Sequence, residues 1–420
     1  MRRAVALVMD GLRRDFIAPD KTPNLSRLTE CATFCAAHRS VTPSVTRVAS
    51  SSFATGCAPA AHGLEANTLA LLENGRFVIH DAGHPDFLQH RRRVTGRSLD
   101  RPTLSERIKE AGGATVYANV SPGAAYCHDP DGHGHLFHRV GSYGPGREPL
   151  PPLPIGGDRE GDRVMTERFV ETVLSKSAPA YALAWLCEPD LTQHAAPLGS
   201  PEHLAALRAA DANAGRVIEA VDRLRQRGEE VLLIIGSDHG HQTVKEVIDL
   251  TAALEGLGYS SLLGSGDLVI VPNGTAALVY ASEAGRSHIP DLAGVMSAQP
   301  WAGEIIVADA LDSIGQAPMR GLALYVSMAA DDEAKNGFGT PGLSFAARPL
   351  AGKPDRLGNG QHGGLGRYEQ SPFLMIEGVG FEAALRRDET SIVDIAPTIL
   401  KHLGLPRDDM SGQALQAARN

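Results

Sequence analysis

The sequence predicts an α/β fold whose mostly parallel central sheet lies between layers of helices. Three runs, residues 4–10, 181–187 and 231–236, are apolar on both faces, which is typical of buried parallel strands. Helical patterns alternate with these runs, and the longest covers residues 201–227. With 420 residues, 43% of them hydrophobic and 21% charged, the chain is large enough to bury a substantial core.

The remaining elements follow in order along the chain. Pro23 and Asn24 indicate the start of a helix over residues 22–33, and the Ser/Thr-rich residues 44–55 are predicted to form a loop that leads into a helix. Further along, the pattern predicts a helix over 104–111, a strand over 114–120, a strand over 373–376 and a helix over 392–403. Residues 121–158 are rich in Gly, Pro and His without periodicity, which favours a long functional loop.

The pattern becomes irregular between residues 241 and 362. Short β-like segments occur there at residues 268–271, 276–280 and 322–326. We therefore predict a core formed by residues 1–255 and 345–420, with an inserted cap subdomain over residues 256–344.

The net charge and the composition of the chain argue against several classes of binding partner. The formal net charge of −9 argues against binding to a nucleic-acid polymer or to an anionic membrane surface. No apolar stretch approaches the length of a transmembrane helix, and Asp10 interrupts the N-terminal apolar run too early for a signal peptide. The five cysteines are consistent with reduced thiols, so we expect a cytoplasmic protein.

Aspartate and histidine residues follow the ends of the predicted strands. Because the carboxyl ends of parallel strands meet at one edge of a sheet, these side chains are expected to gather there. Carboxylate and imidazole ligands favour zinc, with manganese or iron as alternatives. The sequence thus predicts a site for two metal ions, and its ligand-type residues are Asp10, Asp190, His194, Asp238, His239 and His362.

A metal pair of this kind can activate a nucleophile for in-line displacement at phosphorus. Thr46 is the leading candidate, in the segment TPSVTRVASSSFATG. Composition alone does not separate it from Ser44, Ser50, Ser51 and Ser52, because Ser/Thr clusters more often cap helices.

The motifs MDGLRRD, PSVTRVASSSFATG, PAAHGLEANT, EPDLTQH, SDHGH, QHGG and DIAPTIL together resemble the alkaline phosphatase superfamily. Within it, the chain is similar to the branch of nucleotide pyrophosphatase/phosphodiesterases and phosphonoacetate hydrolases. The resemblance implies that Thr46 attacks phosphorus to form a phospho-threonine intermediate and that Asn67 contacts the phosphate. It also implies one metal bound by Asp190, His194 and His362, and a second bound by Asp10, Asp238, His239 and Thr46.

The chain departs from these relatives where they bind the rest of the substrate. Arg47 stands where the nucleotide branch commonly has an aromatic residue, and residues 121–139 lack the lysines expected in the phosphonoacetate branch. Arg47 is a candidate to bind a substrate phosphate or carboxylate. Three histidines of the 121–158 segment are candidates to border the substrate site, with a third metal site as the alternative, namely His128, His133 and His135.

For one histidine and a run of three arginines, the sequence leaves two interpretations open. His241 is predicted to lie behind the metal ligands or to be exposed, and Arg91, Arg92 and Arg93 are predicted to form a solvated face or a substrate-attracting patch.

The predicted function is hydrolysis of a small phosphodiester or phosphonate by a two-zinc enzyme through a covalent Thr46 intermediate. A phosphomonoesterase and a phosphomutase of the same superfamily are the enzymatic alternatives. The remaining alternative is a catalytically silent relative that only binds metal.

Overall fold

The computed structural model describes residues 2–417, and a ten-stranded sheet forms its centre. The middle of this sheet is parallel: β1 (Arg2–Met9) lies between β10 (Glu230–Gly236) and β9 (Tyr181–Leu186). Next to β9 come β5 (Ala114–Ala118) and β6 (His135–Phe137), also parallel. The strands predicted from apolar runs are thus confirmed in the centre of the sheet.

The edges of the sheet are partly antiparallel. β19 (Leu374–Glu377) pairs antiparallel with both β10 and β2 (Thr33–Arg39), and β20 (Ala384–Ser391) completes that edge. At the other edge, β7 (Ser142–Tyr143) and β8 (Pro149–Leu150) follow β6.

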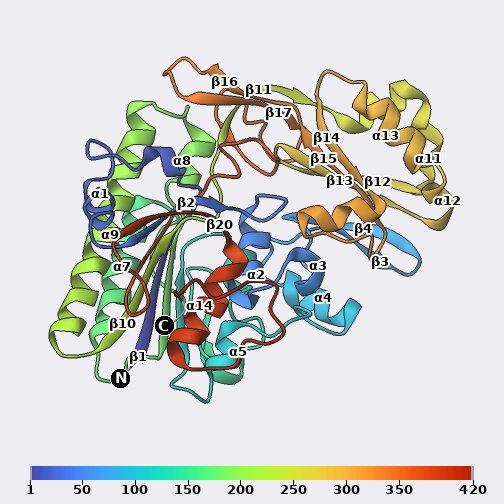
Figure 1. The fold of residues 1–420 in the computed structure, drawn as a ribbon. Helices are drawn as coiled ribbons and strands as arrows, with labels where there is room; N and C mark the ends of the chain where they lie inside the picture. Colours follow the sequence, from blue (N-terminus) through green and yellow to red (C-terminus); the bar gives the residue numbers. More distant parts are fainter. Residues whose placement is uncertain (1, 418–420) are drawn as a thin grey trace.

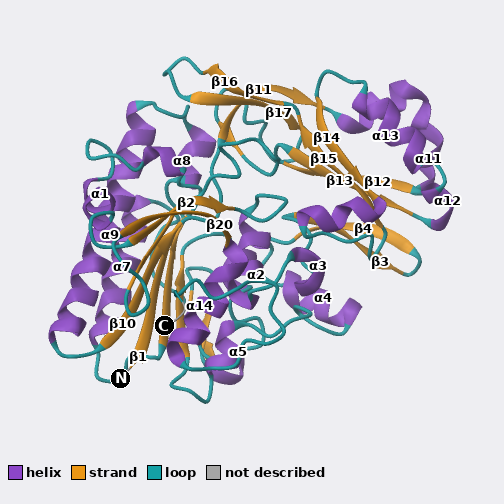
Figure 2. Cartoon of the chain, in the orientation of Figure 1, coloured by secondary structure: helices purple, strands orange, loops and turns teal. Residues whose placement is uncertain are grey.

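Helices cover both faces of the sheet, as predicted (Figures 1 and 2). Val5, Leu7 and Met9 of β1 pack in one cluster with α7 (Arg159–Leu174) and α9 (Pro201–Gln226). Ala4, Ala6 and Val8 face the opposite cluster with α2 (Thr46–Thr55) and α14 (Ile395–Leu403). Because side chains alternate along a strand, β1 contributes to both cores at once. Each fully buried aliphatic side chain contributes about 1.5–3 kcal/mol to folding.

Shorter helices complete these layers and the connections between strands. They are α1 (Pro23–Leu28), α3 (Pro59–His62), α4 (Phe87–Thr95), α5 (Leu104–Ile108), α6 (Pro122–Tyr126) and α8 (Asp190–Ala195). The 3₁₀ helices are Arg14–Phe16, Pro145–Arg147, Ala308–Ile314 and Ile392–Asp394.

The rest of the chain forms three smaller sheets. β12 (Leu268–Asn273), β13 (Ala276–Ala281), β15 (Leu322–Met328) and β14 (Ala302–Val307) form one, with its own apolar cluster. A second contains β16 (Ala330–Lys335), β17 (Pro341–Ala347), β11 (Gln242–Ile248) and β18 (Gly360–Gln361). The third is the hairpin of β3 (Thr68–Glu73) and β4 (Arg76–Asp81).

Helical segments pack beside the first of these sheets (Figure 1). They are α10 (Leu250–Leu254), a π-helical turn (Glu255–Tyr259), α11 (Ser260–Ser265), α12 (Glu283–Arg286) and α13 (Ile289–Ser297). The division of the chain at residues 256 and 344 into a core and a cap stays a prediction.

Three sequence predictions are corrected. The Ser/Thr-rich segment 44–55, expected as a loop, forms helix α2 from Thr46 to Thr55. The helix expected over residues 22–33 ends at Leu28, and Thr33 already begins β2, because this segment pairs with β19 and β20. The loop expected over residues 121–158 contains α6, β6, β7 and β8, each too short to produce a readable period. Among residues 2–417, no helix has the length and hydropathy needed to cross a membrane.

Candidate active site

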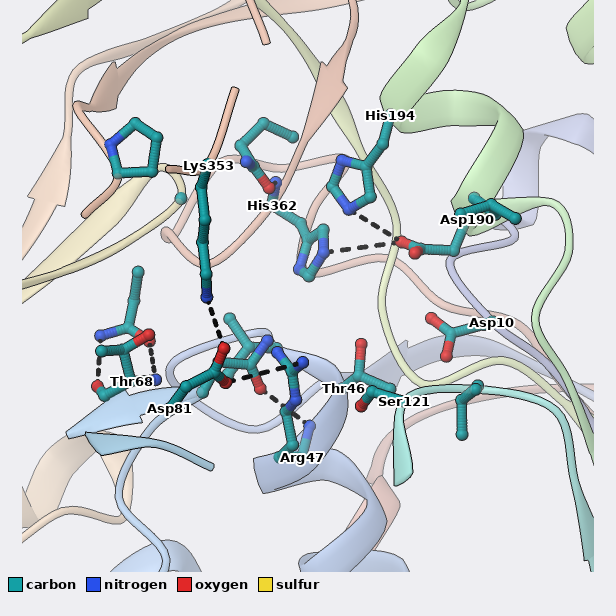
Figure 3. Close-up of a pocket in the computed structure, with 18 of the residues that line it drawn as sticks. Asp10, Thr46, Arg47, Thr68, Asp81, Ser121, Asp190, His194, Lys353 and His362 are labelled. Atoms are coloured by element: carbon teal, nitrogen blue, oxygen red, sulfur yellow. Dashed lines mark hydrogen bonds and ion pairs between the residues drawn. The ribbon is translucent and has the colours of Figure 1, made fainter. Parts of the chain in front are cut away.

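The predicted ligand residues meet at the carboxyl ends of three adjacent parallel strands. Asp10 follows β1, Asp190 begins α8 after β9, and Asp238 and His239 follow β10. His362 directly follows β18 and points toward the same pocket (Figure 3). This is the edge where open α/β sheets place their ligands.

One cluster surrounds the carboxylate of Asp190. His194 Nε2 lies 3.4 Å and His362 Nε2 lies 3.5 Å from Asp190 Oδ1. Nδ1 of His194 faces the Gly360 carbonyl at 2.9 Å, and Nδ1 of His362 faces the Ser44 carbonyl at 2.7 Å. A carbonyl only accepts, so Nδ1 carries the proton and Nε2 presents a lone pair to the carboxylate. Lone pairs that converge in this way fit a bound cation.

His241 joins this cluster. Its Nε2 lies 2.8 Å from Asp190 Oδ1, and the ligand atoms of Asp190, His194, His241 and His362 all lie within 4.8 Å of one another. The side chain is fully buried, which corrects the exposed alternative for His241. Sequence spacing gave no reason to place it with the ligands.

The second cluster contains Asp10, Asp238 and His239, all buried. One oxygen of each carboxylate is satisfied: Asp10 Oδ2 accepts from Trp185 Nε1 at 3.0 Å, and Asp238 Oδ1 accepts from the Gly11 N–H at 3.0 Å. The other oxygens, Asp10 Oδ1 and Asp238 Oδ2, are buried without a hydrogen bond and both face His239 Nε2, at 3.4 Å and 3.2 Å. Two buried carboxylates that share a single imidazole are costly to bury, so this donor set also fits a divalent cation.

The pKa shifts of Asp10 and His239 are also consistent with a cation site in this cluster. Burial, followed by the charges of Asp238 and Asp190, raises the pKa of Asp10 well above its usual value. Burial disfavours the imidazolium of His239, but the charges of Asp238 and Asp10 outweigh it and raise its pKa to about 10. The cluster therefore strongly attracts positive charge, which a metal ion can supply.

Thr46 lies at this cluster, as the first residue of α2. Its Oγ1 is 3.2 Å from His239 Nε2, and the side chain lines the pocket. Ser44 Oγ bonds to the Gly364 carbonyl, and Ser52 Oγ bonds to His62 Nε2. Of the Ser and Thr residues in 44–55, Thr46 is the one that lines the pocket.

Asn67 lines the same pocket. Its Oδ1 accepts the backbone N–H of Arg47 at 2.9 Å, which leaves the amide NH₂ group to donate into the pocket. This is the geometry that a phosphate-contacting amide needs.

The pocket has a volume of about 510 Å³ and contains basic residues that the sequence did not single out. Arg47 was predicted to border it and does so. Arg139, Lys353 and Arg356 also line it, as does Asp81. Lys353 and Arg356 lie shortly before the QHGG motif, but the motif itself contains neither residue, so it gave no reason to place them in the pocket.

The three candidate histidines of the 121–158 segment lie elsewhere, which corrects their predicted role. His128 is buried against the rings of Phe53 and Trp185. His133 lines a separate pocket near Glu106, and His135 is exposed beside Phe137. Arg91 is also corrected: it is fully buried and pairs with Asp100.

A sequence profile of the type I phosphodiesterase / nucleotide pyrophosphatase family matches residues 4–293. No curated protein sequence matches the chain significantly. Among solved structures, murine ectonucleotide pyrophosphatase / phosphodiesterase 5 is similar, as an inactive threonine-to-alanine variant in complex with AMP. It has a TM-score of 0.68 and 16% identity, with 98% of each chain covered. The human counterpart is similar at a TM-score of 0.65 and 15% identity, covering 98% of this chain and 97% of its own.

These structures share the fold, and the profile covers most of the chain. The chain therefore belongs to the type I phosphodiesterase / nucleotide pyrophosphatase family of the alkaline phosphatase superfamily, and it is a metal-dependent hydrolase of phosphorus ester bonds.

Proposed function

We propose that the protein is a two-metal hydrolase of small phosphodiesters or phosphonates and that Thr46 is its nucleophile. The observation that carries this proposal is the position of Thr46 Oγ1. It lies in the pocket, 3.2 Å from His239 Nε2, within a cluster where one buried oxygen of each carboxylate makes no hydrogen bond.

The two clusters would each hold one divalent cation. Asp190, His194 and His362 would bind the first, with His241 against Asp190, and Asp10, Asp238 and His239 would bind the second. The ligand types favour zinc, with manganese or iron as alternatives. When bound, the cations supply Lewis-acid polarisation of phosphate oxygens and stabilise a deprotonated hydroxyl.

The chain's own residues account for the rest of the reaction. Thr46 Oγ1 loses its proton to solvent and attacks phosphorus, a P–O bond to Thr46 forms, and the bond to the leaving group breaks with its electron pair, so that the leaving group departs as an anion or takes up a proton from solvent. The Asn67 amide donates to a non-bridging oxygen, which gains negative charge in the transition state. Water then attacks the phospho-threonine, releases the second product and returns Thr46 to its hydroxyl form.

Two further observations support this interpretation over a catalytically silent relative. Thr46, Asn67 and four predicted ligands line one pocket, namely Asp10, Asp190, His194 and His362, and the other two, Asp238 and His239, cluster with Asp10. The structurally similar murine protein is inactive as a threonine-to-alanine variant that binds AMP. A nucleophilic threonine and a phosphate-ester substrate would explain both.

The test compares Thr46→Ala with Ser50→Ala. Ser50 is a suitable control because it lies on the same helix, is buried and is outside the pocket. With bis-p-nitrophenyl phosphate and bound metal measured in parallel, Thr46→Ala should lower kcat by about 10³-fold or more. Metal content should stay nearly constant, and Ser50→Ala should keep most of the rate. A Thr46→Ala variant at the wild-type rate would replace the covalent scheme with direct attack by water.

A further inference from the structure

One wall of the pocket carries two cations around a single carboxylate. Lys353 Nζ lies 2.7 Å from Asp81 Oδ2, and Arg47 Nη2 lies 3.9 Å from Asp81 Oδ1 (Figure 3). Asp81 ends β4, Lys353 lies in the segment after β17, and Arg47 directly follows Thr46. Three distant parts of the chain thus meet beside the proposed nucleophile.

Two donor atoms of the Arg47 guanidinium, Nε and Nη2, make no hydrogen bond to Asp81 or to other described residues. The distance to Asp81 is too long for a hydrogen bond, and Arg47 Nε is buried with no partner among the described residues. The guanidinium lies close against Gly83, where a Cβ atom would overlap Arg47 Nη2. A guanidinium with free donors is suited to bidentate binding of a carboxylate or phosphate.

The other two cations of the pocket use Nη1 to donate to neutral acceptors of the protein itself. Arg139 Nη1 donates to Asn119 Oδ1 at 2.9 Å and to the Val120 carbonyl at 3.0 Å. Arg356 Nη1 donates to the His194 carbonyl at 3.1 Å. Among the described residues that line the pocket, Arg47 and Lys353 are the two cations that share a carboxylate, and with Asp81 they leave one net positive charge.

We propose that Arg47 and Lys353 bind a second anionic group of the substrate, a carboxylate or a phosphate, separate from the phosphorus that Thr46 attacks. This proposal rests on the proposed function and specifies its substrate class. The substrates are small phosphate esters or phosphonates that carry a further negative group. Asp81 competes for the two cations when that group is absent and holds them in position.

The test uses three esters with the same p-nitrophenyl leaving group. They are ethyl, 2-carboxyethyl and 2-phosphonoethyl p-nitrophenyl phosphate, and the readout is kcat/KM for each anionic ester relative to the ethyl ester. The wild-type protein should prefer at least one anionic ester by about tenfold or more, as expected for one charged hydrogen-bond pair. The better of the two identifies a carboxylate or a phosphate as the preferred group.

Three variants separate recognition from structural damage. Lys353→Met should lower the preference at least fivefold, whereas Asp81→Asn should raise it because the competing charge is removed. Arg348→Met is the matched control: it removes a cation from the same segment, exposed and outside the pocket, and should leave the preference within twofold. General damage would not move Lys353→Met and Asp81→Asn in opposite directions.

The failures of the two proposals are distinguishable. If the ethyl ester is cleaved but neither anionic ester is preferred, the anion site is wrong and the proposed function stands. The same holds if Lys353→Met and Arg348→Met give equal preferences. If the metal-loaded wild-type protein cleaves none of the three esters, both proposals are overturned.

Discussion

Replacing His128 by Phe should make the protein more resistant to acid. The His128 ring is 2% exposed and lies between aromatic side chains, with ring centroids 5.8 Å from Phe53 and 5.1 Å from Trp185. Its Nε2 has no hydrogen-bond partner among the described residues. Burial lowers the pKa of His128 from 6.5 to about 3, because no nearby group compensates the imidazolium for lost hydration.

The size of the effect follows from proton linkage. At pH 5 the unfolded chain protonates His128 and the folded chain does not, so unfolding is favoured by uptake of a proton. Stability from this residue is therefore complete above pH 6.5 and is lost as the pH falls toward 3. At pH 5 the loss is about 2 kcal/mol, since one pKa unit corresponds to about 1.4 kcal/mol. Phe at this site keeps the aromatic contacts and cannot be protonated.

Urea denaturation at pH 7.5 and pH 5.0 measures this loss. In the wild-type protein the free energy of unfolding falls between the two conditions, and in His128→Phe the fall should be smaller by about 2 kcal/mol. His135→Phe is the control, because His135 is exposed and the substitution is the same. An unchanged fall in His128→Phe, or an equal change in His135→Phe, would refute the assignment of a neutral buried imidazole.

Two other predictions concern metal removal and a buried cation. Chelation should lower the melting temperature, because the buried oxygens Asp10 Oδ1 and Asp238 Oδ2 lose the cation and keep only the His239 Nε2 contacts at 3.4 Å and 3.2 Å. Zinc at a thousandfold excess over its Kd should restore about 4 kcal/mol per site, and an unchanged melting temperature in a protein shown to bind two metals would contradict the fit. Arg91→Leu should lower the free energy of unfolding by about 3 kcal/mol, because Arg91 pairs with Asp100 and donates to the carbonyls of Arg97 and Ser98. Urea denaturation checks this against exposed Arg93→Leu, for which about 0.5 kcal/mol or less is expected, and equal losses would contradict it.

The central fold and the cluster residues could be predicted from the sequence for one physical reason. Buried parallel strands are apolar on both faces, so β1, β9 and β10 are visible as continuous apolar runs. Their carboxyl ends must lie at the same edge, which brings Asp10, Asp190 and Asp238 together whatever the intervening chain does. A polar residue that follows one of these apolar runs is therefore a good candidate for the active site.

The His-rich segment was misleading because composition does not distinguish a binding loop from a polar structural one. Asp129 accepts the backbone N–H groups of His133 and Gly134 at 2.8 Å each, so it shapes the turn before β6. The Tyr143 hydroxyl donates to the Asp129 carbonyl. These bonds order the segment locally, whereas the side chains of His133 and His135 lie outside the candidate active site.

The catalytic side of the pocket could be predicted from the sequence, whereas the wall that Asp81, Arg47 and Lys353 form together could not. The half that performs chemistry is built at strand ends, where topology fixes the neighbours. The half that selects the substrate is built where a hairpin end, a helix start and a distant loop meet, at Asp81, Arg47 and Lys353. No strand register links these three residues, and only the tertiary packing places two cations beside one carboxylate. For this reason the reaction class followed from motifs, whereas the second anionic group of the substrate could be inferred only from the assembled wall.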